Sequence, residues 1–171
     1  MADDSARMQR AQPDDPLTPA ELIAAYRQGP MLVRDALEGM NAAMLRARPI
    51  PGKMSSLEVV CHIADCDQFL ADRMKRTIAT ENPLLMGVDG MLYLAALRYQ
   101  DRELELQLRV IEITREQMAA DLDRLDDSAW EREAVHSEDG LMTLEQLLLH
   151  TVRHLESHVA AIREKRDALG L

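Results

Sequence analysis

The stretch HTVRHLESH, residues 150–158, carries three of the five histidines of the chain at intervals of four. On an α-helix these residues share one face, with neighbours about 6 Å apart along the axis. One metal ion could be bound by two adjacent histidines but not by all three, because His150 and His158 would lie about 12 Å apart. The stretch therefore predicts a helix and raises the question of which pair, if any, binds a metal.

The apolar residues around this stretch predict which side of the helix faces the core. They recur at helical spacing: Leu147, Thr151, Leu155, Val159 and Ile162. His154 and His158 fall on the edge of this stripe, so we expect both to face inward. Thr143 and Gln146 have the spacing of a capping box, and the helix should continue from there to about Ala168.

Three further helical patterns precede this one. Together we expect helices at about 18–46, 55–80, 101–125 and 143–168, with a short extra segment at 91–98. Pro30 should kink or split the first helix, leaving one short turn at 41–46. Residues 81–91 should form a connection, and residues 126–141 a turn and loop. Three helices of about 25 residues would each be about 38 Å long, and matching lengths favour an all-α four-helix bundle with long connections.

Length and composition fit a single helical domain. The chain has 171 residues, of which 47% are apolar and 29% charged. Residues 1–16 should be a flexible leader, and residues 17–171 a single four-helix bundle domain. The formal charge of −10 argues against nucleic acid and anionic membrane surfaces as partners, because both require a basic footprint.

The two cysteines and the N-terminus predict the compartment. Cys61 and Cys66 lie five apart on one predicted helix, where their Cα atoms would be about 8 Å apart and beyond disulfide reach. The acidic N-terminus does not resemble a signal peptide, and no run approaches the roughly 18 apolar residues of a membrane span. We therefore expect a cytoplasmic protein.

His62 is the natural third ligand for a metal held by His154 and His158, because it lies on the margin of the second helix's apolar face. Three neutral imidazoles would leave a position open for water or substrate, as in catalytic rather than structural sites. Taken alone, however, a histidine pair spaced by four is more often a packing and hydrogen-bonding feature. Spacing does not show that His62 faces the pair, so both interpretations stay open at this point.

Several segments together resemble the DinB-like superfamily of metalloenzymes. They are LEVVCHIAD at 57–65, ADR at 71–73, and MTLEQLL at 142–148 leading to His154, His158 and Ile162. The resemblance extends over about residues 17–168. It implies a four-helix bundle, often dimeric, with a three-histidine metal site on the second and fourth helices. Carried over by position, the ligands would be His62, His154 and His158, and the metal a divalent transition ion, zinc or nickel.

Two positions depart from the pattern of this superfamily. Its members usually have Trp where this chain has Met54, so the wall of the pocket should differ. They also often have a second histidine beside the last ligand, where this chain has Ser157. Both departures affect the surroundings of the three histidines rather than the histidines themselves.

Five other residues have two interpretations each. His150 could replace a ligand, although a solvent-side or capping role is favoured. His136 could line the mouth of the site, although a plain loop position is favoured. Asp65 could orient a ligand imidazole or pair with an arginine. Cys61 and Cys66 could be soft ligands, but an angular offset of about 140° places them on different faces, and we expect both in the core.

The predicted site favours an enzyme. A metal with three histidine ligands and an open position lowers the pKa of bound water or binds a thiolate. The resemblance implies hydrolysis or thiol transfer, since relatives include transferases and isomerases that use low-molecular-weight thiols. We expect a metal-dependent hydrolase or a thiol-dependent transferase. The sequence offers no convincing general base besides the metal-bound water itself.

The alternative is a non-enzymatic helical module, a stress-associated homodimer in which the metal is structural or absent. The two interpretations differ in solvent access. An open coordination position that faces a pocket favours the enzyme, whereas a closed fourth ligand favours the structural role.

Overall fold

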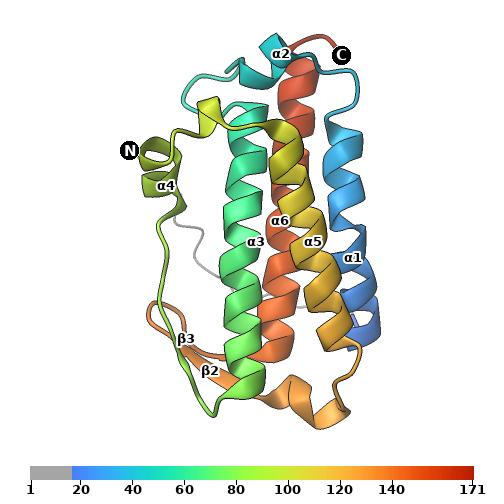
Figure 1. The fold of residues 1–171 in the computed structure, drawn as a ribbon, viewed down its shortest axis with the longest axis vertical. Helices are drawn as coiled ribbons and strands as arrows, with labels where there is room; N and C mark the ends of the chain where they lie inside the picture. The colour runs from blue at the N-terminus through green and yellow to red at the C-terminus, as the bar shows by residue number, and fades with distance from the viewer. Residues whose placement is uncertain (1–16) are drawn as a thin grey trace.

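A computed structural model describes residues 17–171, so the predicted leader at 1–16 lies outside the described residues. Four helices run side by side along the long axis: α1 (Pro19–Ala36), α3 (Ser56–Ala79), α5 (Leu104–Leu122) and α6 (Leu144–Ala168) (Figure 1). Helices α1 and α3 each pack against both α5 and α6. The prediction of a four-helix bundle is confirmed.

Local sequence signals set the beginnings of three of these helices. Capping boxes, with both reciprocal hydrogen bonds, form at Thr18 with Glu21, at Ser55 with Glu58 and at Thr143 with Gln146. Helix α5 is shorter than predicted at both ends, because a 3-10 turn (η1, Tyr99–Asp101) precedes it and a turn follows Leu122. The short helix α2 (Ala42–Arg46) corresponds to the extra turn predicted at 41–46.

Pro30 does not split the first helix. Helix α1 is continuous from Pro19 to Ala36 with Pro30 inside it, so of the two predicted outcomes, a kink or a split, the split is wrong. A proline removes one backbone hydrogen bond, but burial of Tyr26, Gly29 and Val33 on the same helix offsets this cost through packing.

The connections contain a small sheet that the sequence did not predict. Strand β1 (Leu84–Leu85) pairs in parallel with β2 (Glu133–His136), which pairs antiparallel with β3 (Gly140–Thr143). A 3-10 turn (η2, Asp127–Glu131) precedes the hairpin, and helix α4 (Gly90–Ala96) follows β1. The turn and loop predicted at 126–141 therefore missed two strands. Strands of two to four residues are too short to show a period, and they are stabilised by pairing with β1.

The interior contains two apolar clusters, one toward each end of the bundle. The cluster on the hairpin side is formed mainly by Tyr26, Met74, Met118, Trp130 and Leu148, and the other by Val33, Val60, Ile63, Ile111 and Val159. Leu, Met, Ala, Ile and Val supply most of both, as expected for a chain with few aromatic residues. No helix within residues 17–171 is long and apolar enough to cross a membrane.

A buried ion pair joins all four helices in the interior. Arg115 on α5 donates to both carboxylate oxygens of Asp67 on α3, at 2.6 and 2.8 Å, and the two side chains are 1% and 0% exposed. The same guanidinium donates to the carbonyl of Tyr26 on α1 at 3.1 Å and of Thr151 on α6 at 3.5 Å. The charge is therefore paired and its donors are directed at acceptors.

Candidate metal centre

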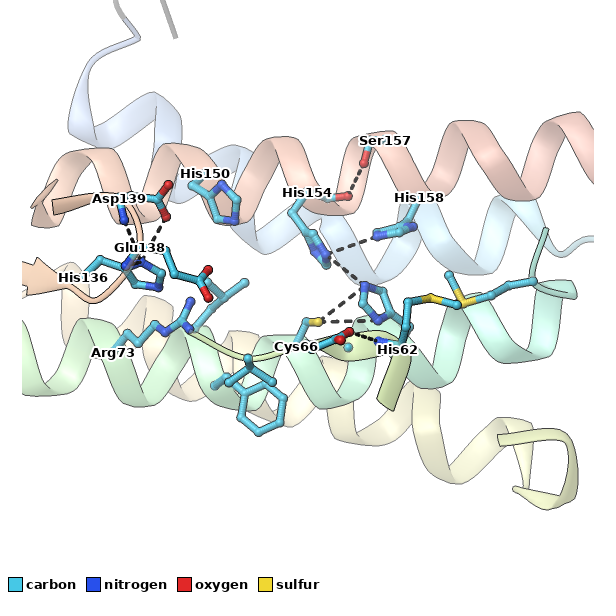
Figure 2. A pocket seen from close by; sticks show the side chains of 17 residues that line it. His62, Cys66, Arg73, His136, Glu138, Asp139, His150, His154, Ser157 and His158 are labelled. Carbon is cyan, nitrogen blue, oxygen red and sulfur yellow. Dashed lines mark hydrogen bonds and ion pairs between the residues drawn. The ribbon is translucent and has the colours of Figure 1, made fainter. Parts of the chain in front are cut away.

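Three histidines from two helices converge in the structure. His62 on α3 approaches His154 on α6 with 3.2 Å between their Nε2 atoms, and the Nε2 atoms of His154 and His158 lie 3.1 Å apart (Figure 2). One nitrogen of each ring lies within 4.8 Å of the others. The folded chain thus brings His62 to the pair predicted from the last helix.

Hydrogen bonding among the three rings does not satisfy this cluster. A neutral imidazole has one N–H and one lone pair, so Nε2 of His154 can donate to or accept from only one of its two neighbours. Nδ1 of His154 is also buried and, within the described part of the chain, has no hydrogen-bond partner. The packing interpretation of the pair therefore leaves polar atoms unsatisfied.

The geometry and electrostatics of the cluster fit a divalent metal. Tetrahedral zinc with Zn–N bonds of about 2.05 Å would place ligand nitrogens about 3.3 Å apart, close to both observed separations. Burial, followed by the neighbouring histidines, lowers the pKa of His154 well below its usual value, and burial lowers the pKa of His158 to about 3. Both rings are therefore neutral at pH 7, which is the form that binds metals.

The cluster faces a pocket of about 240 Å³ between α3 and α6. One end is lined by His62, Cys66, His154, Ser157, His158 and Met54, and the other by Arg73, His136, Glu138, Asp139 and His150. Phe69 and Leu70, which stand between His62 and Arg73 along α3, also line the pocket, as do Val88 and Met91. Met54 thus belongs to the pocket wall at the position where the superfamily usually has Trp.

The structure also places two histidines whose roles the sequence left open. His150 lies in the pocket, half-buried, with its ring centroid 6.1 Å from that of His154, rather than on the solvent side as we expected. It does not belong to the group of three that could share one metal. His136 lies on strand β2 rather than in a plain loop, is 4% exposed, and lines the pocket.

Asp65 adopts the second of its two predicted roles. Its carboxylate accepts hydrogen bonds from Tyr99 Oη at 2.7 Å and from Arg102 Nη1 at 2.8 Å. These contacts connect α3 to the start of α5 and hold the end of the long connection. The interaction with Arg102 is the arginine pairing that the sequence left as an alternative.

Cys66 is a pocket residue that the sequence analysis assigned to the core. Cys61 is buried as expected, but Cys66 is half-buried, and its Sγ lies 3.5 Å from Nε2 of His62. Burial raises the pKa of the Cys66 thiol to about 12. The sequence did contain a pattern that predicts this position: Cys66 follows His62 by four residues and therefore shares its face of the helix.

Gly90, the first residue of α4, packs against the ring of His62. A Cβ at this position would lie 2.6 Å from Cε1 of His62, so only glycine allows the start of α4 to approach the ring this closely. The long connection between α3 and α5 therefore forms part of the site.

Comparison with known proteins gives a consistent picture. The model of a family described as the DinB superfamily matches residues 25–162. A Bacillus licheniformis protein named "putative metal-dependent hydrolase" is 26% identical over 149 residues, covering 86% of this chain and 85% of that protein.

Two solved structures share the fold. YfiT from Bacillus subtilis, described as "a probable metal-dependent hydrolase with an unusual four-helix bundle topology", gives a TM-score of 0.86 at 22% identity over 94% of both chains. A mycothiol-dependent maleylpyruvate isomerase gives a TM-score of 0.68 at 13% identity over 84% of this chain. This chain spans only 60% of the isomerase.

Proposed function

The chain belongs to the DinB superfamily, and on this premise we propose that it is a metal-dependent hydrolase whose divalent metal is bound by His62, His154 and His158. The observation that carries the proposal is the convergence of three imidazoles, within 4.8 Å of one another, on the wall of a pocket. Imidazole ligands suit zinc, and also nickel, and we propose these two metals.

In this proposal, the pocket residues bind the metal and contact the substrate. The three imidazoles bind the metal in their neutral form, and Gly90 leaves room for the ring of His62. When bound, the metal would supply Lewis acidity and activation of water near neutral pH. Phe69 and Leu70 line the pocket on α3 and would give the substrate an apolar contact surface.

The size of the pocket limits the substrate. Pockets for drug-sized ligands usually measure about 300–1,000 Å³, and this pocket is smaller, at about 240 Å³. It therefore encloses a small molecule or only the reacting end of a larger one. A pocket that faces the cluster favours a catalytic metal over the structural metal of the non-enzymatic alternative.

Thiol transfer is the second candidate. It is favoured by the fold shared with the mycothiol-dependent isomerase, together with a three-histidine cluster that could bind a thiolate. In that case the thiol compound would extend out of the pocket, because the enclosed volume is small. The homodimer and the cytoplasmic location stay predictions.

The test is metal content and turnover in matched variants. Purified protein, stripped with a chelator and reloaded with zinc or nickel, should bind about one metal per chain and hydrolyse members of an ester and amide panel without added thiol. His62→Ala and His154→Ala should each weaken metal binding by about 100-fold or more, because two ligands remain. His150→Ala is the matched control, since His150 lines the same pocket without joining the group of three.

The possible results of this test distinguish the hydrolase from the thiol transferase and from a structural metal site. Unchanged metal content in both His62→Ala and His154→Ala would refute the proposed centre. Turnover that appears only with an added low-molecular-weight thiol would replace the hydrolase with the transferase. Tight metal binding without any turnover across the panel would favour the structural metal.

A further inference from the structure

The end of the pocket opposite the three histidines contains an arginine without a carboxylate partner. Within residues 17–171, the Arg73 guanidinium donates one hydrogen bond, from Nη2 to the carbonyl of Met86 at 2.6 Å, and forms no ion pair. Burial lowers the pKa of Arg73, and the carboxylates of Asp139 and Glu138 offset this effect only in part. In the described part of the chain, the guanidinium therefore lies near carboxylates without contacting one, and has N–H donors that a ligand in the pocket could meet.

A second polar group at this end also lacks a partner. His136 is 4% exposed, and its Nε2 atom is buried without a hydrogen bond in the described part of the chain. Its Nδ1 atom lies 3.0 Å from the Asp139 carboxylate and also accepts from the backbone N–H groups of Glu138 and Asp139 at 3.4 and 3.3 Å. With Nδ1 as the acceptor, the proton of the neutral ring is on Nε2, which can donate to a carboxylate. Figure 2 shows Arg73 reaching from α3 toward His136 and Glu138. Two nitrogen-bearing side chains therefore meet at one place with donors or acceptors unused.

The carboxylates at this end limit the charge of a ligand. Asp139 is engaged with His136, whereas Glu138 is exposed and lies so close to Gly87 that a Cβ there would overlap its carboxylate. Two negative side chains beside one guanidinium disfavour a doubly charged group such as phosphate more than a singly charged one. A carboxylate, which matches a guanidinium in bidentate geometry, suits the site better.

We propose that this end of the pocket, around Arg73 and His136, is a subsite that binds a carboxylate group of the substrate. The inference rests on the proposed function, because it makes the substrate a molecule with a hydrolysable group at the three histidines and a carboxylate at the far end. Arg73 lies eleven residues after His62 on α3, or about three helical turns. Phe69 and Leu70 stand between them on α3, and the two positions are about 16 Å apart along the helix axis, so an extended apolar segment joins the two polar groups of the substrate.

The class of substrate that follows is an ester or amide with a free carboxylate at the far end of an apolar chain. Half-esters and half-amides of long-chain dicarboxylic acids are the simplest examples. Arg73 and His136 would position such a substrate and select it against neutral analogues, because an unpaired guanidinium is left without an anion when the ligand is neutral.

Binding of glutarate, with neutral glutaramide as its matched analogue, tests the subsite without turnover. Calorimetric titration of the metal-loaded protein should show glutarate binding at least tenfold more tightly than glutaramide. Arg73→Met should weaken glutarate binding by about 10- to 100-fold, the usual size for a hydrogen bond to a charged group, and leave glutaramide unchanged. Arg73→Lys should retain part of the affinity.

Two controls make the result specific. Arg76→Met removes an exposed arginine of the same helix that pairs with Asp72 and does not line the pocket, so it should leave glutarate binding unchanged. Repeating the titration on His154→Ala subtracts any binding of glutarate to the metal. The subsite should survive this substitution, which separates its failure from failure of the metal centre.

The inference is overturned if Arg73→Met and Arg73→Lys both bind glutarate like the wild type, or if glutaramide binds as tightly as glutarate. Loss of glutarate binding in His154→Ala but not in Arg73→Met would also overturn it, because the metal centre would then be the binding site. The same holds if the wild-type protein does not bind glutarate.

Discussion

Two polar clusters share helix α3 but differ in how completely their hydrogen bonds are satisfied. In the first, Arg115 and Asp67 form two direct bonds, and the remaining guanidinium contacts go to backbone carbonyls. In the second, His154 meets His62 and His158 through a single nitrogen and leaves Nδ1 without a partner in the described structure. Asp67 is only five residues from His62 on α3, so the two clusters are neighbours.

The difference in hydrogen bonding indicates a structural role for one cluster and a binding role for the other. A buried charge that is fully paired needs nothing further, and it joins four helices in one arrangement. The histidine cluster on the pocket wall has a buried nitrogen without a hydrogen-bond partner in the described structure, so it can still bind a ligand such as a metal ion. The first cluster therefore supports the fold, and the second is the candidate site.

The largest effect should come from breaking the satisfied cluster. Asp67→Ala leaves Arg115 buried without its counter-charge and should lower the free energy of unfolding by about 3–5 kcal/mol, measured by urea denaturation. The double variant Asp67→Leu/Arg115→Met should recover most of the loss, because it removes both charges. His154→Ala, measured without metal, should change stability by only about 1 kcal/mol. Equal losses in Asp67→Ala and His154→Ala would remove the distinction between the clusters.

An intermediate effect should come from the glycine beside each cluster. A Cβ at Gly29 would overlap Nη1 of Arg115, which the ion pair holds in place, so Gly29→Ala should cost about 2 kcal/mol of stability. Gly90→Ala should instead displace the ring of His62 and weaken metal binding by about tenfold, with a smaller loss of stability. Urea denaturation and metal competition titrations measure the two effects. The comparison fails if Gly90→Ala costs more stability than Gly29→Ala.

Near neutral pH, the smallest effect should come from titration of the histidines in the metal-free protein. The pKa of His158 is lowered from 6.5 to about 3, and that of His154 is lowered in the same direction. The unfolded chain therefore binds more protons than the folded chain over this range, and stability should fall as pH drops from 6.5 toward 3. The slope should be at most about 1.4 kcal/mol per pH unit for each histidine.

Denaturation of the metal-free protein between pH 6.5 and 5 measures this slope. A His154→Ala/His158→Ala variant should show a shallower dependence, because both titrating groups are gone. If the variant and the wild type have the same slope, the two rings are not held in their neutral form by the fold.

Local chemistry made much of the fold predictable. Three capping boxes, each visible as a Ser or Thr three residues before Glu or Gln, form at the predicted positions. Helical spacing also placed His154 and His158 on one face toward the interior. Such features depend on residues a few positions apart, so their energetics are present in the sequence itself.

Predictions were wrong where distant segments decide the outcome. Residues 133–143 form a hairpin that pairs with β1, about 50 residues earlier in the chain. His150 faces a pocket because the hairpin and α3 lie opposite it, and helical spacing alone could not show this. The spacing of four residues could have placed Cys66 on the same helix face as His62. That this face lines a pocket is shown only by the folded bundle.

By itself, the sequence determined four amphipathic helices, the capping boxes of three of them and a row of histidines on one helix face, because these depend on short-range spacing and side-chain chemistry. Tertiary structure alone decided that His62 meets His154 across 92 residues, and that Arg73 and His136 share the far end of the same pocket. The reason is physical: contacts between distant residues form only when burial of the helix faces outweighs the entropy of closing the loops between them.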